Sequence, residues 1–236
     1  MRAVRSPAAA AGAALATAAA WSAPALAPLV PSLCRSLGLE RTLPGEEPVV
    51  AITFDDGPHP EGTPAVLEAL AAAGARATFF LVGEQVRRWP GLAAEVAAAG
   101  HTIALHGDRH RLQLRVRPAA LARDLDRGHA TITEATGIAP TLIRAPYGIF
   151  SPAGLAIARR RGWRPLLWSR WGRDWRRFRT PAQIVAKVTE ELQAGDVLLL
   201  HDADHYSASG SWRRTAAALP LVLAEIERRG LRATAL

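Results

Sequence analysis

The chain has 236 residues, of which 49% are hydrophobic and 21% are charged, and this balance excludes an intrinsically disordered protein. The net charge of +8 would suit an anionic partner, but no basic stretch is interleaved with aromatic residues, which argues against a nucleic-acid-binding protein. Cys34 is the single cysteine, so an intrachain disulfide and a thiolate metal site are both excluded.

Residues 1–46 differ in composition from the rest of the chain. Arg2 and Arg5 precede an alanine-rich run that extends to Trp21, and small residues follow up to Ala27, an arrangement typical of a secretory signal. The run is only weakly apolar and prolines follow it, which predicts a signal-like or membrane-apposed segment and linker rather than a transmembrane span. We expect a secreted or membrane-associated protein with peripheral membrane contact through this segment. A cytoplasmic protein with a loose N-terminal arm is the alternative.

From Val49 onward, strand-like and helix-like stretches alternate. Apolar runs bounded by glycine and proline predict strands at 49–54, 76–82, 101–105, 141–144, 164–168, 196–200 and 231–235. Helical patterns lie between them at 62–73, 90–99, 118–136, 152–161, 181–193 and 212–229. This alternation predicts one α/β domain over residues 47–236 with a parallel sheet, either open and doubly wound or closed into a barrel.

Titratable residues follow several of the predicted strands. Asp55 and Asp56 come directly after the first strand, at a point where two adjacent buried carboxylates would need a cation between them. His106 and His110 follow the third strand at a spacing of i, i+4, which predicts both imidazoles on one face of a helical turn. His201 follows the sixth strand. Because catalytic groups gather at the carboxyl ends of parallel strands, we expect these side chains to share a site.

The residue types at this edge suit a mononuclear metal hydrolase. One carboxylate and two neutral imidazoles form a three-ligand set for one divalent ion, with Zn²⁺ favoured and Co²⁺, Ni²⁺ or Mn²⁺ as alternatives. The second carboxylate can take a proton from water, and a histidine on the opposite rim can protonate a leaving amine.

Five motifs between residues 53 and 202 resemble, in order and spacing, those of the polysaccharide deacetylase family, also called the NodB-homology or carbohydrate esterase family 4 domain. The resemblance extends from about Val49 to the end of the chain. It implies a single-domain distorted (β/α)₇ barrel with its active site at the C-terminal ends of the strands. The implied reaction is metal-dependent hydrolysis of an N- or O-acetyl group on a sugar. The implied partner is an acetylated cell-wall polysaccharide, glycan oligomer or lipid-linked sugar.

The same resemblance assigns roles around the predicted metal ion. Asp56, His106 and His110 would be its ligands. Asp55 would be the general base, and Arg144 would pair with Asp55 to keep it ionised and oriented.

On the opposite rim, the resemblance makes His201 the general acid, with Asp174 holding its imidazole. The backbone N–H of Tyr147 would face the developing oxyanion, and Leu199 and Trp175 would line the acetyl-binding pocket.

Two positions depart from the family pattern. Gly107 stands where Ser or Thr commonly hydrogen-bonds to fix the loop, and Trp171 stands where a further aspartate is frequent. Both changes affect the shape of the substrate cleft rather than the chemistry. The aromatic residues Trp168, Trp171, Trp175 and Trp212, with Tyr206, form either a platform for a sugar or lipid or simple core and loop packing.

Two other functions remain open from the sequence. One is a non-catalytic barrel that binds carbohydrate or lipid, which the loss of a ligand or base would have favoured. The other is a related amidase that acts on non-sugar C–N bonds, since only the cleft would differ. Asp204 and His205 could indicate a second metal site, but a polar loop is the preferred interpretation.

Overall fold

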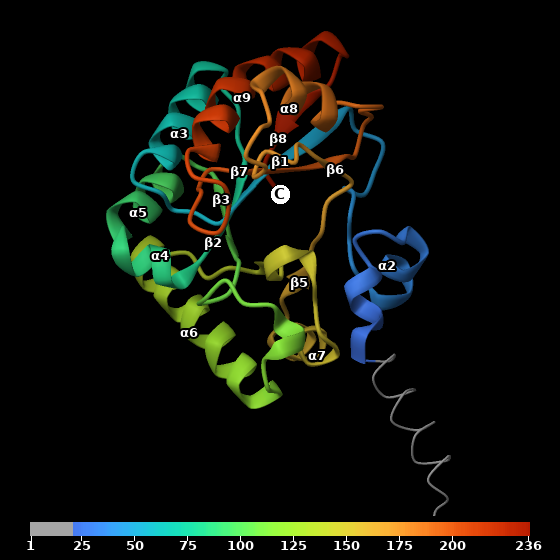
Figure 1. The fold of residues 1–236 in the computed structure, drawn as a ribbon, viewed down its shortest axis with the longest axis vertical. Coiled ribbons are helices and arrows are strands. Elements are labelled where there is room, and N and C mark those ends of the chain that lie inside the picture. Colours follow the sequence, from blue (N-terminus) through green and yellow to red (C-terminus); the bar gives the residue numbers. More distant parts are fainter. Residues whose placement is uncertain (1–20) are drawn as a thin grey trace, which may run out of the picture.

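A computed structural model describes residues 21–236 and shows a curled sheet with helices around its outer side (Figure 1). Residues 1–20, which include most of the signal-like run, lie outside the described part of the chain. The strands run in the order β5-β4-β3-β2-β1-β7-β6, with β8 paired to β1, and all of these pairings are parallel. Their bounds are β1 Val49–Asp55, β2 Thr78–Leu81, β3 Thr102–Leu105, β4 Leu142–Ile143, β5 Arg164–Pro165, β6 Arg170–Trp171, β7 Val197–His201 and β8 Arg232–Thr234. This sheet confirms the predicted distorted (β/α)₇ barrel.

Strand β1 is an inner strand between β2 and β7, and its end positions the two adjacent aspartates. Its residues from Val50 to Asp55 are all buried, because both faces of a parallel strand are covered. In the β1–β7 register Asp55 lies opposite His201, and in the β1–β2 register it lies opposite Phe80. Two groups 146 residues apart in the sequence, Asp55 and His201, therefore meet at one end of the sheet.

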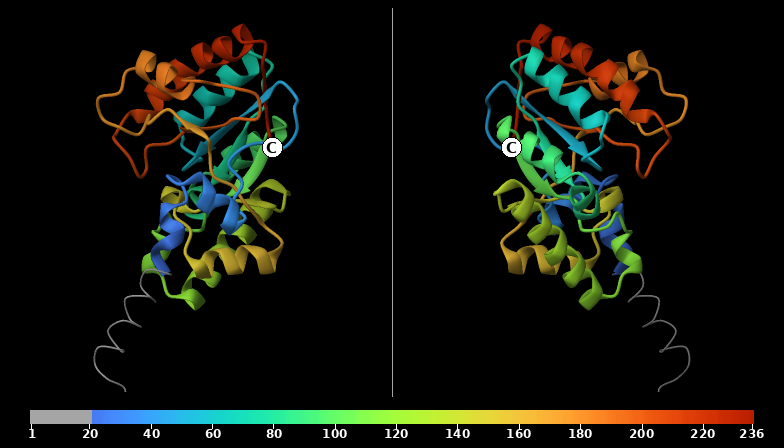
Figure 2. Two further views of the ribbon diagram at one scale, coloured as in Figure 1. Left: turned by 90° about the vertical axis from the view of Figure 1, so that its right-hand side faces the viewer. Right: turned by 90° about the vertical axis from the view of Figure 1, so that its left-hand side faces the viewer.

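The helices connect the strands on the outside of the barrel (Figure 2). Their bounds, with short 3₁₀ helices as η, are η1 Ala23–Leu26, α2 Pro31–Leu37, α3 Gly62–Ala72, α4 Gly83–Arg88, α5 Pro90–Ala98, η2 Gln113–Arg115, α6 Pro118–Thr136, η3 Pro146–Gly148, α7 Pro152–Arg161, α8 Pro181–Val188 and α9 Ser211–Arg228. Within residues 21–236, no helix combines the length and apolar character needed to cross a membrane.

Several elements differ from the predictions. Helix α8 ends at Val188 rather than at 193, because a turn with a positive φ of 48° at Glu191 follows it. The predicted strand 164–168 is shorter, and a separate strand β6 forms at Arg170–Trp171. Helix α4 was not predicted, since its six residues are too few for a helical periodicity.

The segment before β1 bridges the chain just after β5 and the chain just before β7. Glu40 pairs in parallel with Leu166, and Thr42 pairs antiparallel with Asp196. Leu39 is only 5% exposed, and Figure 2 shows this part of the chain, in blue, against the side of the barrel. The division of the chain into 1–46 and 47–236 stays a prediction, but the later part of the first segment contacts the barrel.

Candidate active site

A cavity of about 230 Å³ lies at the carboxyl ends of the central strands. Most of the predicted site residues line it. The lining residues are Asp55, Asp56, His106, His110, Tyr147, Gly148, Trp168, Trp171, Trp175, Leu199, His201, Tyr206 and Ser207. The remaining two predicted residues, Arg144 and Asp174, are fully buried behind this wall.

Asp56 is directed toward two imidazoles. Its backbone has a positive φ of 80°, which is uncommon for a residue other than glycine and is characteristic of functional sites. Its Oδ1 lies 3.5 Å from His106 Nε2 and 3.3 Å from His110 Nε2, and it has no hydrogen-bond partner among the described residues. Burial raises the pKa of Asp56 to about 7, and the charge of Asp55 acts in the same direction. Burial thus outweighs the opposing charge of nearby His201, and a cation at Oδ1 would favour the ionised form of Asp56.

The two histidines reach Asp56 from an irregular loop. The predicted helical turn was wrong: residues 106–110 form no helix, and the loop turns at Gly107 with a φ of 90°. His106 Nδ1 donates to the Arg144 carbonyl oxygen at 2.9 Å, which leaves its Nε2 free to accept. Burial lowers the pKa of His106 and of His110 to about 3, so both imidazoles are neutral at pH 7. Neutral imidazoles with an available Nε2 fit the requirements of metal ligands.

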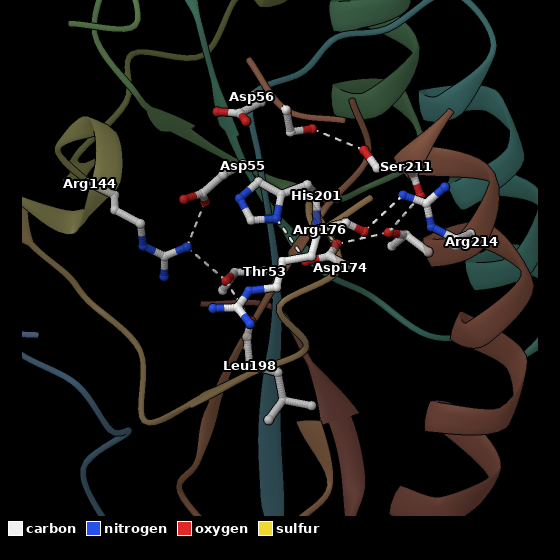
Figure 3. A network of polar contacts seen from close by, with 12 residues as sticks. Thr53, Asp55, Asp56, Arg144, Asp174, Arg176, Leu198, His201, Ser211 and Arg214 are labelled. Carbon is white, nitrogen blue, oxygen red and sulfur yellow. Dashed lines mark hydrogen bonds and ion pairs between the residues drawn. The ribbon is translucent and has the colours of Figure 1, made fainter. Parts of the chain in front are cut away.

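Arg144 holds one oxygen of Asp55. Its Nη1 donates to Asp55 Oδ1 at 2.6 Å and to Thr53 Oγ1 at 2.9 Å (Figure 3). Its other nitrogens donate to the carbonyl oxygens of Leu166 and Leu167. Burial raises the pKa of Asp55, and the guanidinium offsets part of this effect. The sequence analysis did not predict the role of Thr53 in binding Arg144, although a polar residue inside an apolar strand could have indicated it.

Asp174 holds His201 through two groups. Asp174 Oδ1 lies 3.0 Å from His201 Nδ1, and Oδ2 accepts from the His201 backbone N–H at 2.7 Å (Figure 3). Thr215 Oγ1 also donates to Oδ2 at 2.8 Å, a contact that nothing in the sequence indicated. Burial alone lowers the pKa of His201, but the charge and hydrogen bond of Asp174 outweigh it and raise the pKa to about 10. His201 is therefore protonated at neutral pH.

The tryptophans form one wall of the cavity and also pack on one another. Trp168 and Trp171 stack with ring centroids 5.8 Å apart, and Trp171 contacts Trp175 at 5.4 Å. Trp175 meets the His201 ring edge-on at 5.4 Å. A side chain at Gly148 would lie 2.5 Å from the Trp168 ring, so the wall also requires a glycine at this position. The packing alternative is confirmed, and the role of these rings as a platform for a sugar or lipid stays a prediction.

A second cluster, formed by His59, Asp204 and His205, has the ligand types of a metal site. Its hydrogen bonds argue against that function. His59 Nδ1 accepts from Gly62 N–H at 2.9 Å, so His59 Nε2 carries the proton and donates to Asp204 at 3.2 Å. His205 Nε2 donates to the Pro58 carbonyl oxygen at 3.1 Å. These bonds tie the loop after β1 to the loop after β7, in agreement with the polar-loop interpretation.

Tyr206 is the cavity residue whose role the sequence analysis missed, since it was considered there only as part of a sugar platform. It stacks on the His110 imidazole, and its hydroxyl contacts Glu84 and Gln85 of helix α4. No local pattern in the sequence connects these residues.

Known proteins share this architecture. The family model for polysaccharide deacetylase matches residues 42–166. A peptidoglycan-N-acetylglucosamine deacetylase of Bacillus cereus is 35% identical over 192 residues, covering 80% of this chain and 87% of that protein. A chitooligosaccharide deacetylase of a Bradyrhizobium species is 35% identical over 188 residues, covering 77% of this chain and 85% of that protein.

Solved structures agree with the sequence comparisons. The crystal structure of a peptidoglycan N-acetylglucosamine deacetylase superimposes with a TM-score of 0.80 at 27% identity, covering 87% of this chain and 94% of that one. The predicted resemblance, the barrel fold and the sugar-deacetylase class of function are thereby confirmed. The chain belongs to the polysaccharide deacetylase family.

Proposed function

We propose that this protein is a metal-dependent hydrolase that removes an acetyl group from an amino sugar of a cell-wall glycan or glycan oligomer. The observation that carries the proposal is the buried, unpartnered Asp56 Oδ1 within 3.5 Å of two neutral imidazole nitrogens. The relatives that act on peptidoglycan N-acetylglucosamine and on chitooligosaccharides support an N-acetyl group as the target.

Asp56, His106 and His110 fit one divalent ion, and Zn²⁺ suits this donor set best, with Co²⁺, Ni²⁺ or Mn²⁺ as alternatives. A divalent ion bound there supplies Lewis-acid chemistry, which polarises a carbonyl group and acidifies water. The two imidazoles would not have to lose a proton before they bind the ion, because His106 and His110 are already neutral at pH 7.

Asp55 acts as the general base. Arg144 occupies its Oδ1, while Oδ2 lies on the side of His106 Nε2, at 3.8 Å, and is free to take a proton from water. The attachment to Arg144 fixes the orientation of the carboxylate, so that the proton-accepting oxygen faces the ligands.

His201 acts as the general acid on the other side of the cavity. Asp174 fixes Nδ1–H, and the pKa of about 10 keeps the second ring nitrogen protonated beforehand, so that it can give its proton to the departing acetamide nitrogen. The backbone N–H of Tyr147 stabilises the oxyanion that develops on the acetyl group. Tyr147 lines the cavity with a positive φ of 62°, a strained conformation that supports a functional role.

The apolar residues that line the cavity determine which substrate fits it. Trp175 and Leu199 form the surface against the acetyl methyl group, and Trp168 and Trp171 extend this surface toward the sugar ring. A non-catalytic barrel would be expected to have lost a ligand, the base or the acid, and this chain retains all of them.

The test is a mass-spectrometric screen of metal-loaded protein against peptidoglycan fragments, chitin oligomers, acetylated xylan and acetylated glycolipids. We expect loss of acetyl mass from an N-acetylglucosamine-containing substrate, and a much slower loss with the Asp55→Asn variant. Acetyl loss confined to non-sugar amides would contradict the proposal and favour the amidase alternative.

We also propose that the protein is exported or membrane-associated through its N-terminal segment. Arg2, Arg5 and the alanine-rich run support this location. Fractionation of cells that express the full chain, with N-terminal sequencing of the product, would test it. Recovery of the protein only from the cytoplasm would contradict export.

A further inference from the structure

A histidine that binds a metal through one ring nitrogen is ordinarily oriented by a hydrogen bond at the other. His106 follows this pattern, because its Nδ1 lies 2.9 Å from the Arg144 carbonyl oxygen. The Nδ1 of His110 is buried and has no hydrogen-bond partner within residues 21–236. Some other contact must therefore fix the orientation of the His110 ring.

Two tyrosines contact that ring. Tyr206 stacks on its face, with ring centroids 4.3 Å apart and planes inclined by 10°. Tyr147 meets its edge at 4.5 Å and 70°, but the Tyr147 side chain is 56% exposed and is therefore less constrained. The Tyr206 ring, which covers the flat face of the imidazole, is the contact that can prevent the ring from turning.

Tyr206 is itself fixed at its far end. Its hydroxyl donates to Glu84 Oε1 at 2.7 Å and accepts from Gln85 Nε2 at 2.8 Å. Gln85 is only 2% exposed, and both partners belong to helix α4. Tyr206 cannot swing away from His110 without breaking two hydrogen bonds to a helix of the barrel.

We propose that Tyr206 is a positioning residue for the metal ligand His110. The aromatic face of Tyr206 takes the place of the hydrogen bond that His110 Nδ1 lacks. In this role Tyr206 contacts neither the ion nor the bond of the substrate that reacts. It acts by keeping His110 Nε2 directed toward Asp56 Oδ1, 3.3 Å away. The inference rests on the proposed metal centre and adds to it a residue outside the ligand set.

The test compares two substitutions that both remove the hydroxyl and differ in the aromatic face. Tyr206→Leu fills much of the same space without a flat ring, whereas Tyr206→Phe keeps the ring. We expect Tyr206→Leu to bind Zn²⁺ and Co²⁺ about 10–100-fold more weakly than the wild type, the usual effect of losing an outer contact of a ligand. We expect Tyr206→Phe to remain closer to the wild type than to Tyr206→Leu. Chelator competition gives both dissociation constants, and the visible spectrum of the Co²⁺ form reports the ligand geometry.

Trp171→Leu is the matched control, because it removes another aromatic ring of the same cavity that contacts no proposed ligand. Its metal affinity should equal that of the wild type. Thermal unfolding of the metal-free variants verifies that each is folded. Equal affinity of Tyr206→Leu and Tyr206→Phe, or an equal loss in Trp171→Leu, would overturn the inference. Failure of the wild type to bind any ion would instead overturn the metal centre itself.

Discussion

Asp55 has one oxygen occupied by Arg144 and one directed toward the proposed ligands, so its two functions can be separated by substitution. Asp55→Asn retains an oxygen that can accept from Arg144, but the amide cannot take a proton from water. We expect full metal binding and a loss of about 10²–10⁴-fold in the rate of deacetylation. Metal content and acetate release, measured on one preparation, test this expectation. Wild-type rates in Asp55→Asn would remove this carboxylate from the mechanism.

His201 owes its high pKa to Asp174, which predicts a particular dependence on pH. The acid must be protonated, so activity should fall as the pH rises through the pKa of His201. Asp174→Asn removes the charge that raises this pKa, and the alkaline limb of the rate profile should therefore move to lower pH.

The control for this pH shift is Asp126→Asn. Asp126 pairs with Arg161 on the surface and is absent from the cavity, so its variant should keep the wild-type profile. An alkaline limb that stays in place in Asp174→Asn would show that His201 does not limit the rate as the acid.

At the scale of elements, the segment before β1 that bridges the end of β5 and the start of β7 should contribute to stability. Leu39 is 5% exposed in this segment, and Leu39→Ala should lower the free energy of unfolding by about 2–5 kcal/mol. Leu29→Ala is the matched control, because Leu29 is 70% exposed and its loss should change stability by less than about 0.5 kcal/mol. Denaturant unfolding of the two variants measures both changes. Equal stabilities would show that the bridging segment is not an integral part of the fold.

The elements that the sequence predicted correctly are those with local signals. The apolar run from Val49 to Ile52 is followed by Asp55, Asp56 and a glycine–proline stop, and it became strand β1. Strand β6 has two residues, and its position depends on Arg170 bonding to Asp196 across the sheet. The loop that carries His110 depends on the positive φ of Gly107, and the i, i+4 spacing alone wrongly indicated a helix.

The residues of the candidate site also differ in whether a local sequence signal predicts them. Residues with distinctive chemistry at strand ends, such as Asp56 and His201, could be found from their positions. Thr53, Thr215 and Tyr206 act through contacts with partners 91, 41 and 121 residues away, respectively, and no local pattern encodes these pairings. Only the folded chain brings them together.

At the scale of the whole molecule, the central claim is that this barrel is a metal-dependent deacetylase whose ion is held by Asp56, His106 and His110. The most direct measurement is acetate release from N-acetylglucosamine oligomers and peptidoglycan fragments by chelator-treated protein before and after Zn²⁺ is restored. We expect no release without the ion, recovery with one equivalent of Zn²⁺ per chain, and no recovery in Asp56→Ala, which lacks the carboxylate ligand. Acetate release at the same rate from the metal-free protein, or full recovery in Asp56→Ala, would contradict the account.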